Sequence, residues 1–164
     1  MKSLIIFLHL FTCCLQGQTI KSTKNFSLLG SWTINKYVFS DISAMTEKVA
    51  QEWKGKKATF TKVIHFPYYD IPTYKNTFAN NSFKDNCNCG DIKNRYLHPD
   101  TSVSTEKYLV KFKMNSTKLG INKKTILLVR TNCSETPFEE IIVKNNNEII
   151  IFWDGTFFNL TRDK

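Results

Sequence analysis

Few side chains in this sequence have the types and spacing that catalysis needs. Glu139 and Glu140 are adjacent, so in a strand they would point to opposite faces and could not act as an acid–base pair. His65 and His98 stand in no motif with Asp or Ser, and we expect His65 to be an exposed strand residue rather than a general base. The sequence also contains no glycine-rich phosphate loop, nucleophile elbow or metal-binding histidine pair. We therefore predict a protein that is not an enzyme and that holds no metal or cofactor.

The cysteines beyond residue 17 predict one disulfide. They are Cys87, Cys89 and Cys133, an odd number that leaves one thiol over. Cys87 and Cys89 are too close in the sequence to bridge each other without strain, so we expect one of them to pair with Cys133. Such a bridge is typical of an oxidising export compartment, and closing a loop of roughly 45 residues would stabilise the fold by about 3 to 4 kcal/mol.

The first 17 residues have the features of a secretory signal peptide. Lys2 supplies a basic start, residues 4–11 form an apolar run and Gly17 is a small residue at the expected cleavage point. The apolar run is too short to span a bilayer. We therefore expect no transmembrane segment and a secreted or periplasmic protein.

Cleavage after Gly17 would leave residues 18–27 as a polar lead-in and residues 28–164 as the folded domain. The chain of 164 residues is long enough for one well-buried core and too short for two comfortable domains. A competing interpretation is a lipoprotein anchored at Cys13 or Cys14. In either case we expect a monomer.

The excess of basic residues does not indicate nucleic-acid binding. The formal net charge is +9, but only three of the 23 basic residues are Arg and the rest are Lys. Clustered Arg is the residue that phosphate and base recognition prefer. We expect the lysines to lie on a solvated surface, which could also contact a protein partner.

The end of the chain predicts a β-hairpin. Two apolar runs between residues 148 and 162 flank Asp154-Gly155, and this dipeptide suits a tight turn because both of its residues must accept positive φ. Alternation of apolar and polar residues predicts further antiparallel strands. These lie over residues 32–38, 58–66, 106–114, 125–133 and 139–144.

Two segments interrupt this pattern of strands. In residues 41–53, Met45, Val49 and Trp53 fall on one helical face, with Asp41 and Ser43 as candidate N-caps. This helix could pack outside the sheet or close a barrel mouth. Residues 67–99 are rich in Asn, Asp, Pro and Tyr, which is typical of a functional loop or of irregular strands.

Several motifs at the two ends of the predicted sheet occur together. Gly30-Ser31-Trp32 opens the first strand and Arg162 follows the last one. In these features the sequence resembles the calycin group of lipocalins and fatty-acid-binding proteins. A small group of exported, lipocalin-like bacterial proteins is similar in more detail. The matching motifs are Ser43-Ala44-Met45, Trp53-Lys54-Gly55-Lys56 and Trp153-Asp154-Gly155-Thr156-Phe157-Phe158.

The resemblance implies an all-β, mainly antiparallel fold: a lipocalin-like up-and-down β-barrel with one helix after the first strand. It also implies that Arg162 packs over the indole ring of Trp32 and closes the barrel floor.

We expect such a barrel to hold a small apolar molecule in its lumen. The candidate lumen residues are Trp32, Ile34, Phe60, Tyr108, Phe112, Trp153 and Phe157. These side chains could equally fill a solid core. The alternative function is a protein-interaction module, such as an inhibitor or immunity-type partner of a secreted enzyme, acting through the basic surface and the loops of residues 67–99.

Overall fold

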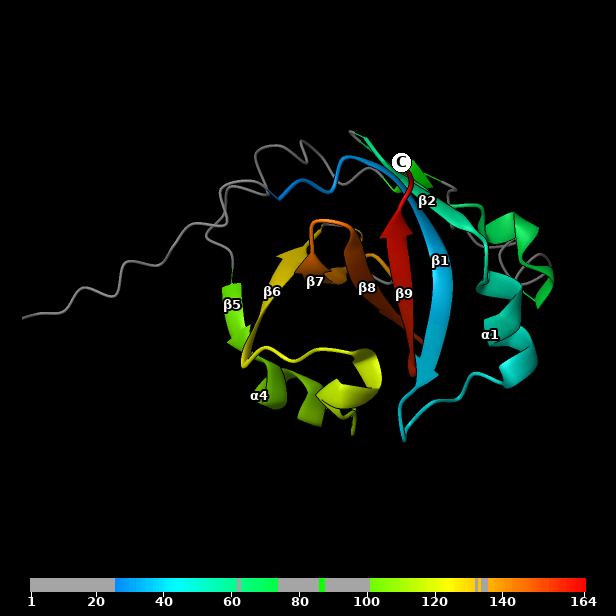
Figure 1. Ribbon diagram of the computed structural model, residues 1–164. Helices are drawn as coiled ribbons and strands as arrows, with labels where there is room; N and C mark the ends of the chain where they lie inside the picture. Colours follow the sequence, from blue (N-terminus) through cyan, green and yellow to red (C-terminus); the bar gives the residue numbers. More distant parts are fainter. Residues whose placement is uncertain (1–25, 62, 74–85, 88–100, 132, 134–135) are drawn as a thin grey trace, which may run out of the picture.

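One antiparallel sheet of nine strands organises the computed structural model, which describes residues 26–61, 63–73, 86–87, 101–131, 133 and 136–164 (Figure 1). The strands are β1 (Gly30–Phe39), β2 (Lys57–Phe60), β3 (Ile64–His65), β4 (Asn86–Cys87), β5 (Thr101–Ser104), β6 (Thr125–Arg130), β7 (Glu140–Asn145), β8 (Glu148–Trp153) and β9 (Thr156–Arg162). Their order across the sheet is β4-β3-β2-β1-β9-β8-β7-β6-β5. The predicted all-β, mainly antiparallel class is therefore confirmed.

The sheet consists of two meanders that meet in the middle. Strands β1 to β4 form one and β5 to β9 form the other, and the pairing of β1 with β9 joins them. The sheet curves from β6 round to β1 and β2 (Figure 1). Strands β4 and β5 are its two edges, and no pairing joins them within the described residues. The sheet is open there rather than closed into a barrel.

The C-terminal hairpin of β8 and β9 forms as predicted. Trp153 pairs with Thr156, and the two residues between them have φ angles of 47° at Asp154 and 77° at Gly155. This positive φ at both positions is the backbone of the turn that best matches the twist of paired strands.

A β-bulge in β1 changes which side chains share a face. Ile34 pairs with Leu160 and Lys36 pairs with Asn159, so Asn35 is an extra residue in β1. Simple alternation over the predicted strand of residues 32–38 would place Val38 on the face of Trp32 and Ile34. The bulge reverses the alternation beyond it, so Val38 lies on the opposite face, and Lys36 is exposed.

The strand predicted over residues 58–66 is a hairpin instead. β2 ends at Phe60, which pairs with Ile64 at the start of β3. Between them, the amide of Thr61 donates to the carbonyl of Val63 over 2.9 Å. Phe60 and Ile64 are both buried, so the apolar pattern across the turn looks like that of a continuous strand. His65 is exposed, as expected.

The helix predicted over residues 41–53 is present but shorter. α1 (Glu47–Trp53) begins at its N-cap Thr46, whose hydroxyl accepts from the amide of Val49 over 3.4 Å, so neither Asp41 nor Ser43 is the cap. Trp53 stacks on Phe158 of β9 with ring centroids 4.6 Å apart. α1 therefore packs against a face of the sheet.

The strand predicted over residues 106–114 was wrong, because α4 (Thr105–Val110) occupies most of this segment. Ser104 is its N-cap, accepting from the amide of Lys107 over 3.4 Å. Tyr108 and Leu109 are buried. Val110 would share a face with Tyr108 in a strand, because the two residues are two positions apart, but it is 66% exposed. Tyr108 and Phe112 are four residues apart in the sequence. Residues at this spacing lie on one face both in a strand and in a helix, so the spacing fits both structures.

Both faces of the sheet are covered, and each carries its own hydrophobic core. We call one the tryptophan core; its aromatic side chains include Trp32, Trp53, Phe60, Phe66, Phe138 and Phe158. We call the other the α4 core; it contains Tyr108, Leu109, Met114, Leu119, Ile121, Ile126, Leu128, Ile142, Ile150 and Phe157.

Along β8, Ile149 and Ile151 belong to the tryptophan core and Ile150 to the α4 core, which explains why this strand is apolar at successive positions.

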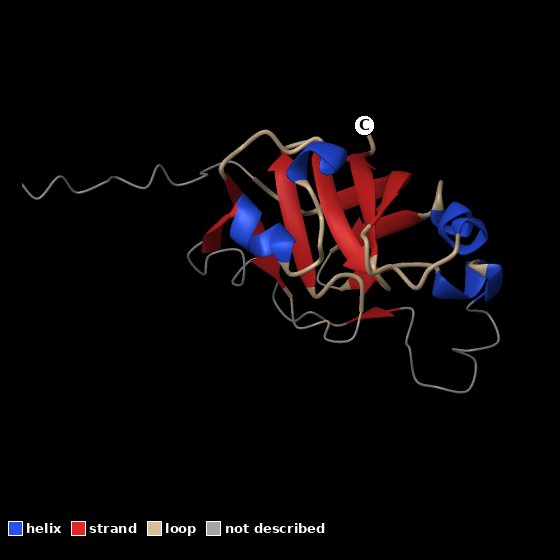
Figure 2. Ribbon diagram, turned by 90° about the horizontal axis from the view of Figure 1, so that it is seen from below, coloured by secondary structure: helices blue, strands red, loops and turns tan. Residues whose placement is uncertain are grey.

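Short helices cover the two cores. α1 and η1 (Tyr68–Asp70) lie over the tryptophan core, whereas α4 and η2 (Ser116–Leu119) lie over the α4 core. Figure 2 shows the helices in two separate groups. None of the helices in the described ranges is long and apolar enough to cross a membrane.

Candidate functional site

The structure divides the seven predicted lumen residues between the two cores. Trp32, Ile34 and Phe60 belong to the tryptophan core. Tyr108, Phe112 and Phe157 belong to the α4 core, whereas Trp153, half-buried at the end of β8, packs against the tryptophan core. Because the sheet separates the two cores, these side chains do not share one internal space. Three of them do meet: the ring centroid of Phe112 lies 5.4 Å from that of Tyr108 and 5.4 Å from that of Phe157.

Arg162 lies over the indole ring of Trp32, with its guanidinium carbon 4.1 Å from the ring centroid. The two residues pair directly across β1 and β9. The guanidinium also donates to the carbonyls of Leu29, Ser27 and Asn146, the first over 2.7 Å and the last over 3.0 Å. Gly30 has a φ of +118°, and a Cβ at this position would lie 3.2 Å from this guanidinium, so glycine suits the position for both reasons. The contact therefore lies at one end of the central pair of strands, β1 and β9, in an open sheet rather than at the floor of a closed barrel.

An aromatic cleft of about 340 Å³ lies between α4 and the β8–β9 turn. Its lining residues are Tyr108, Phe112, Thr136, Glu139, Glu140, Phe152, Trp153 and Asp154. Phe157 lies behind the wall, with its ring centroid 5.4 Å from that of Phe112 and 4.8 Å from that of Phe152. Helix α4 and strand β8 thus bring together aromatic side chains that are about 40 residues apart in the sequence.

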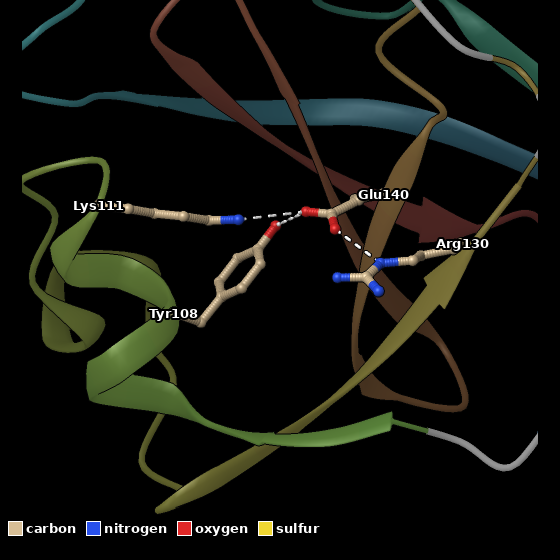
Figure 3. A network of polar contacts seen from close by, with 4 residues as sticks. All are labelled: Tyr108, Lys111, Arg130 and Glu140. Carbon is tan, nitrogen blue, oxygen red and sulfur yellow. Dashed lines mark hydrogen bonds and ion pairs between the residues drawn. The ribbon is translucent and has the colours of Figure 1, made fainter.

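Glu140 is the centre of a polar network at this cleft (Figure 3). The Tyr108 hydroxyl donates to its Oε2 over 2.8 Å, and Arg130 Nε donates to its Oε1 over 2.8 Å. The Lys111 ammonium lies 3.4 Å from Oε2. Arg130 and Glu140 face each other across β6 and β7, so the sheet register sets this pair. The network ties α4 to the sheet.

The network also sets the ionisation of its members. Partial burial opposes ionisation of Glu140, but the hydrogen bonds from Tyr108 and Arg130 and the charges of Lys111 and Arg130 outweigh it and lower its pKa. Burial, followed by the adjacent Glu140 charge, raises the pKa of the Tyr108 hydroxyl far above its ordinary value. At neutral pH the site therefore holds a carboxylate and a neutral phenol that donates to it.

Lys111 extends over the aromatic wall. Its ammonium lies 4.1 Å from the Tyr108 ring centroid and 4.8 Å from the Phe112 ring centroid. The spacing of residues 108, 111 and 112 is that of one helix face, which is why the amine and both rings meet. This contact between a cation and aromatic faces is a favourable one.

Glu139 and Glu140 both line the cleft. The expectation that they point to opposite faces applied only if both residues lie in a strand. β7 begins at Glu140, and Glu139 precedes it. Glu140 is also engaged by Tyr108, Arg130 and Lys111, which is an arrangement for holding a charge in place.

Sequence reasoning missed Lys111, Arg130 and Glu140 as site residues. The signal that could have revealed part of the network is the spacing of Tyr108, Lys111 and Phe112 on a helix, which the strand interpretation concealed. Nothing in the sequence pairs Arg130 with Glu140, because that contact depends on strand register.

A second depression of about 680 Å³ runs along the other side of α4. Its lining residues are Asp41, Glu106, Leu109, Val110, Lys113, Met114, Asn115 and Ser116. It has no aromatic wall, and Asp41 is paired with Lys118 at 3.7 Å. Aromatic side chains provide more contact area to a small ligand, so the aromatic cleft is the better candidate.

Several predictions fall outside the described residues. These are the signal peptide of residues 1–17, most of the lead-in of residues 18–27, the anchor at Cys13 or Cys14, Cys89, and most of the loops of residues 67–99. Cys133 is buried in the tryptophan core, and its bridge to Cys87 or Cys89 stays a prediction. No group of three potential metal ligands occurs among the described residues.

Comparison with protein-family models, with curated proteins and with solved structures found no match to this chain. The resemblance to calycins therefore rests on the motifs of the sequence itself.

Proposed function

We propose that this protein is a non-catalytic binding protein that holds a small, ring-bearing apolar molecule in the aromatic cleft. The observation that carries the proposal is the open space of about 340 Å³ beside Tyr108, Phe112, Phe152 and Trp153. Ligand sites are typically concave, mostly apolar and of about 300 to 1,000 Å³, with a few fixed polar groups. The proposal keeps the predicted apolar ligand and moves it from a barrel lumen to this cleft.

The polar network supports binding because it prepares the cleft in advance. Glu140 holds Tyr108 through a hydrogen bond of 2.8 Å, and Arg130 in turn orients Glu140. A wall that is already positioned loses less conformational entropy when a ligand arrives. The carboxylates of the lining give a bound molecule polar groups against which it can orient.

Kinship and location are further parts of the proposal. The pairing of Trp32 with Arg162 at the ends of β1 and β9 supports a distant relationship to the calycin barrels. The apolar run of residues 4–11 supports export from the cytoplasm. The alternative, a protein-interaction module that acts through the basic surface and residues 67–99, stays a prediction.

The test is a titration of the mature protein with N-phenylnaphthylamine, a neutral probe whose fluorescence rises in apolar surroundings. We expect saturable binding that Phe112→Ala weakens about tenfold or more, because this ring forms part of the wall. The control is Val110→Ala, at the end of α4 two residues before Phe112 but outside the aromatic cleft.

Circular dichroism would show that both variants are folded. Absence of saturable binding in the folded wild type, or equal affinity in the two variants, would contradict the proposal. Native mass spectrometry of protein purified without added lipid would then identify the mass of any molecule that the cleft retains.

A further inference from the structure

An amine already lies against two aromatic side chains that line the cleft. The Lys111 ammonium is 4.1 Å from the Tyr108 ring centroid and 3.4 Å from Glu140 Oε2 (Figure 3). It is also 4.8 Å from the Phe112 ring centroid. Two ring faces and a carboxylate are the groups that recognise ammonium ligands. The cleft wall therefore provides the chemistry of an ammonium site, with a side chain of the protein as its occupant.

Lys111 can leave this position without exposing an unpaired charge. Glu140 keeps two other partners, the Tyr108 hydroxyl and Arg130 Nε, each at 2.8 Å. Breaking a pair is costly when it strands a buried charge, and here none is stranded. The Lys111 side chain is also 48% exposed and sits on a flexible four-carbon stem, so its ammonium can move into water.

The charges around the cleft favour a cation as its occupant. Glu139, Glu140 and Asp154 line it, whereas Lys111 and Arg130 are the cations bound to Glu140. Asp154 is exposed and forms no salt bridge among the described residues. An incoming amine would therefore find, in the carboxylate of Asp154, a second acidic group in the lining of the cleft.

We propose that the ligand of the cleft carries an amine next to its ring system, and that Lys111 occupies the place of this amine until the ligand displaces it. This inference rests on the proposed function of the cleft and specifies the class of ligand. Lys111 acts as a tethered competitor. The apparent affinity for an amine is therefore the intrinsic affinity multiplied by the fraction of time that the Lys111 ammonium is away from the rings.

The experiment uses three probes that share one ring: naphthylethylamine, a cation at neutral pH, naphthylethanol, which is neutral, and naphthylacetate, an anion. Isothermal titration of the mature protein at one fixed ionic strength gives the three affinities. We expect the amine to bind about tenfold more tightly than the alcohol, and the acid to bind most weakly.

Two variants assign the effect to named groups. Lys111→Met keeps an apolar stem and removes the competing ammonium, so amine affinity should rise about three- to tenfold while alcohol affinity changes little. Asp154→Asn should weaken amine binding about threefold, and Asn tolerates the φ of 47° at this turn position. The matched control is Lys113→Met, which removes the same charge from a residue that lines the other depression.

The outcomes separate the inference from the proposed function. If the alcohol binds as tightly as the amine and Lys111→Met has no effect, the amine assignment is overturned while the binding cleft stands. If the acid binds most tightly, the inference is overturned and Lys111 is an anion-binding residue. If none of the three probes binds to folded protein, the proposed function fails and the inference fails with it.

Discussion

The two faces of the sheet differ in how completely their aromatic side chains are packed. In the tryptophan core, Trp53 stacks on Phe158 at 4.6 Å and Phe138 meets both Phe60 and Phe66 within 5.7 Å, and all of these rings are buried. In the α4 core, Phe112 and Phe152 are only half-buried and border an open cleft. These rings of the tryptophan core are buried from solvent, whereas Phe112 and Phe152 on the other face are partly exposed to it.

Polar groups mark the same difference. On the α4 side, Glu140 receives hydrogen bonds from Tyr108 and Arg130 at the border of the rings. The partly exposed rings are thus held in place by a polar network rather than by apolar neighbours on every side. A protein that uses one face for stability and the other for binding would show this contrast, which the following variants test.

The largest expected effect comes from the closed face. Trp53→Ala should lower the free energy of unfolding by about 3 to 5 kcal/mol, because it removes a fully buried ring and leaves a cavity. Phe112→Ala should lower it by only about 1 kcal/mol, because that ring is half-buried. Urea denaturation measures both values. Equal losses would show that the two faces contribute alike to stability.

A smaller effect should arise where the β8–β9 turn meets the β1–α1 loop. A Cβ on Gly155 would lie 2.2 Å from Ser43 Cα, at a φ of +77°, so Gly155→Ala should cost about 2 to 3 kcal/mol and move the cleft wall at Asp154.

The control for this turn is Gly55→Ala. Gly55 has a similar φ of +83° but no atom within 4 Å of the added Cβ, so only the backbone strain of about 1 kcal/mol should remain. Thermal unfolding of both variants would separate the clash from the strain. If both lose the same stability, the contact between turn and loop does not hold the cleft wall.

The smallest effect should be a pH dependence that belongs to the open face. The pKa of Glu140 is lowered in the folded protein, so its contribution to stability is complete above its ordinary pKa and is lost as pH falls through the folded value. Glu140→Gln should therefore be less stable than wild type at neutral pH, and the gap should narrow toward pH 3. Unfolding curves across this range measure it, with Glu106→Gln on α4 as the charge-matched control. A gap that stays constant with pH would show that the carboxylate charge is not what the network stabilises.

Local sequence signals predicted the elements whose structure depends on neighbouring residues. Asp154-Gly155 indicated the β8–β9 hairpin because few dipeptides accept positive φ at both positions. The strands predicted over residues 125–133 and 139–144 correspond to β6 and β7, with ends that differ by one to three residues. Met45, Val49 and Trp53 indicated α1, although its N-cap at Thr46 was missed.

The errors occurred where an apolar pattern fits two structures. Residues 105–110 alternate like a strand, yet they form α4, because the Ser104 cap and the burial of Tyr108 and Leu109 favour a helix at this place in the fold. The bulge at Asn35 and the turn after Phe60 were also missed, because the apolar residues around them follow a pattern that a continuous strand would show as well. Each changes which face a side chain occupies, and no local pattern reports it.

The sequence by itself determined the antiparallel β-rich class, the terminal hairpin and the presence of one helix after β1, because turn chemistry and side-chain periodicity act between near neighbours. Only the tertiary structure decided which aromatic side chains meet. Phe112 reaches Phe152 because α4 packs on the face of the sheet opposite to Trp32, and Arg130 reaches Glu140 through the register of β6 and β7. These contacts join residues distant in the sequence, so their positions depend on the packing of the whole sheet.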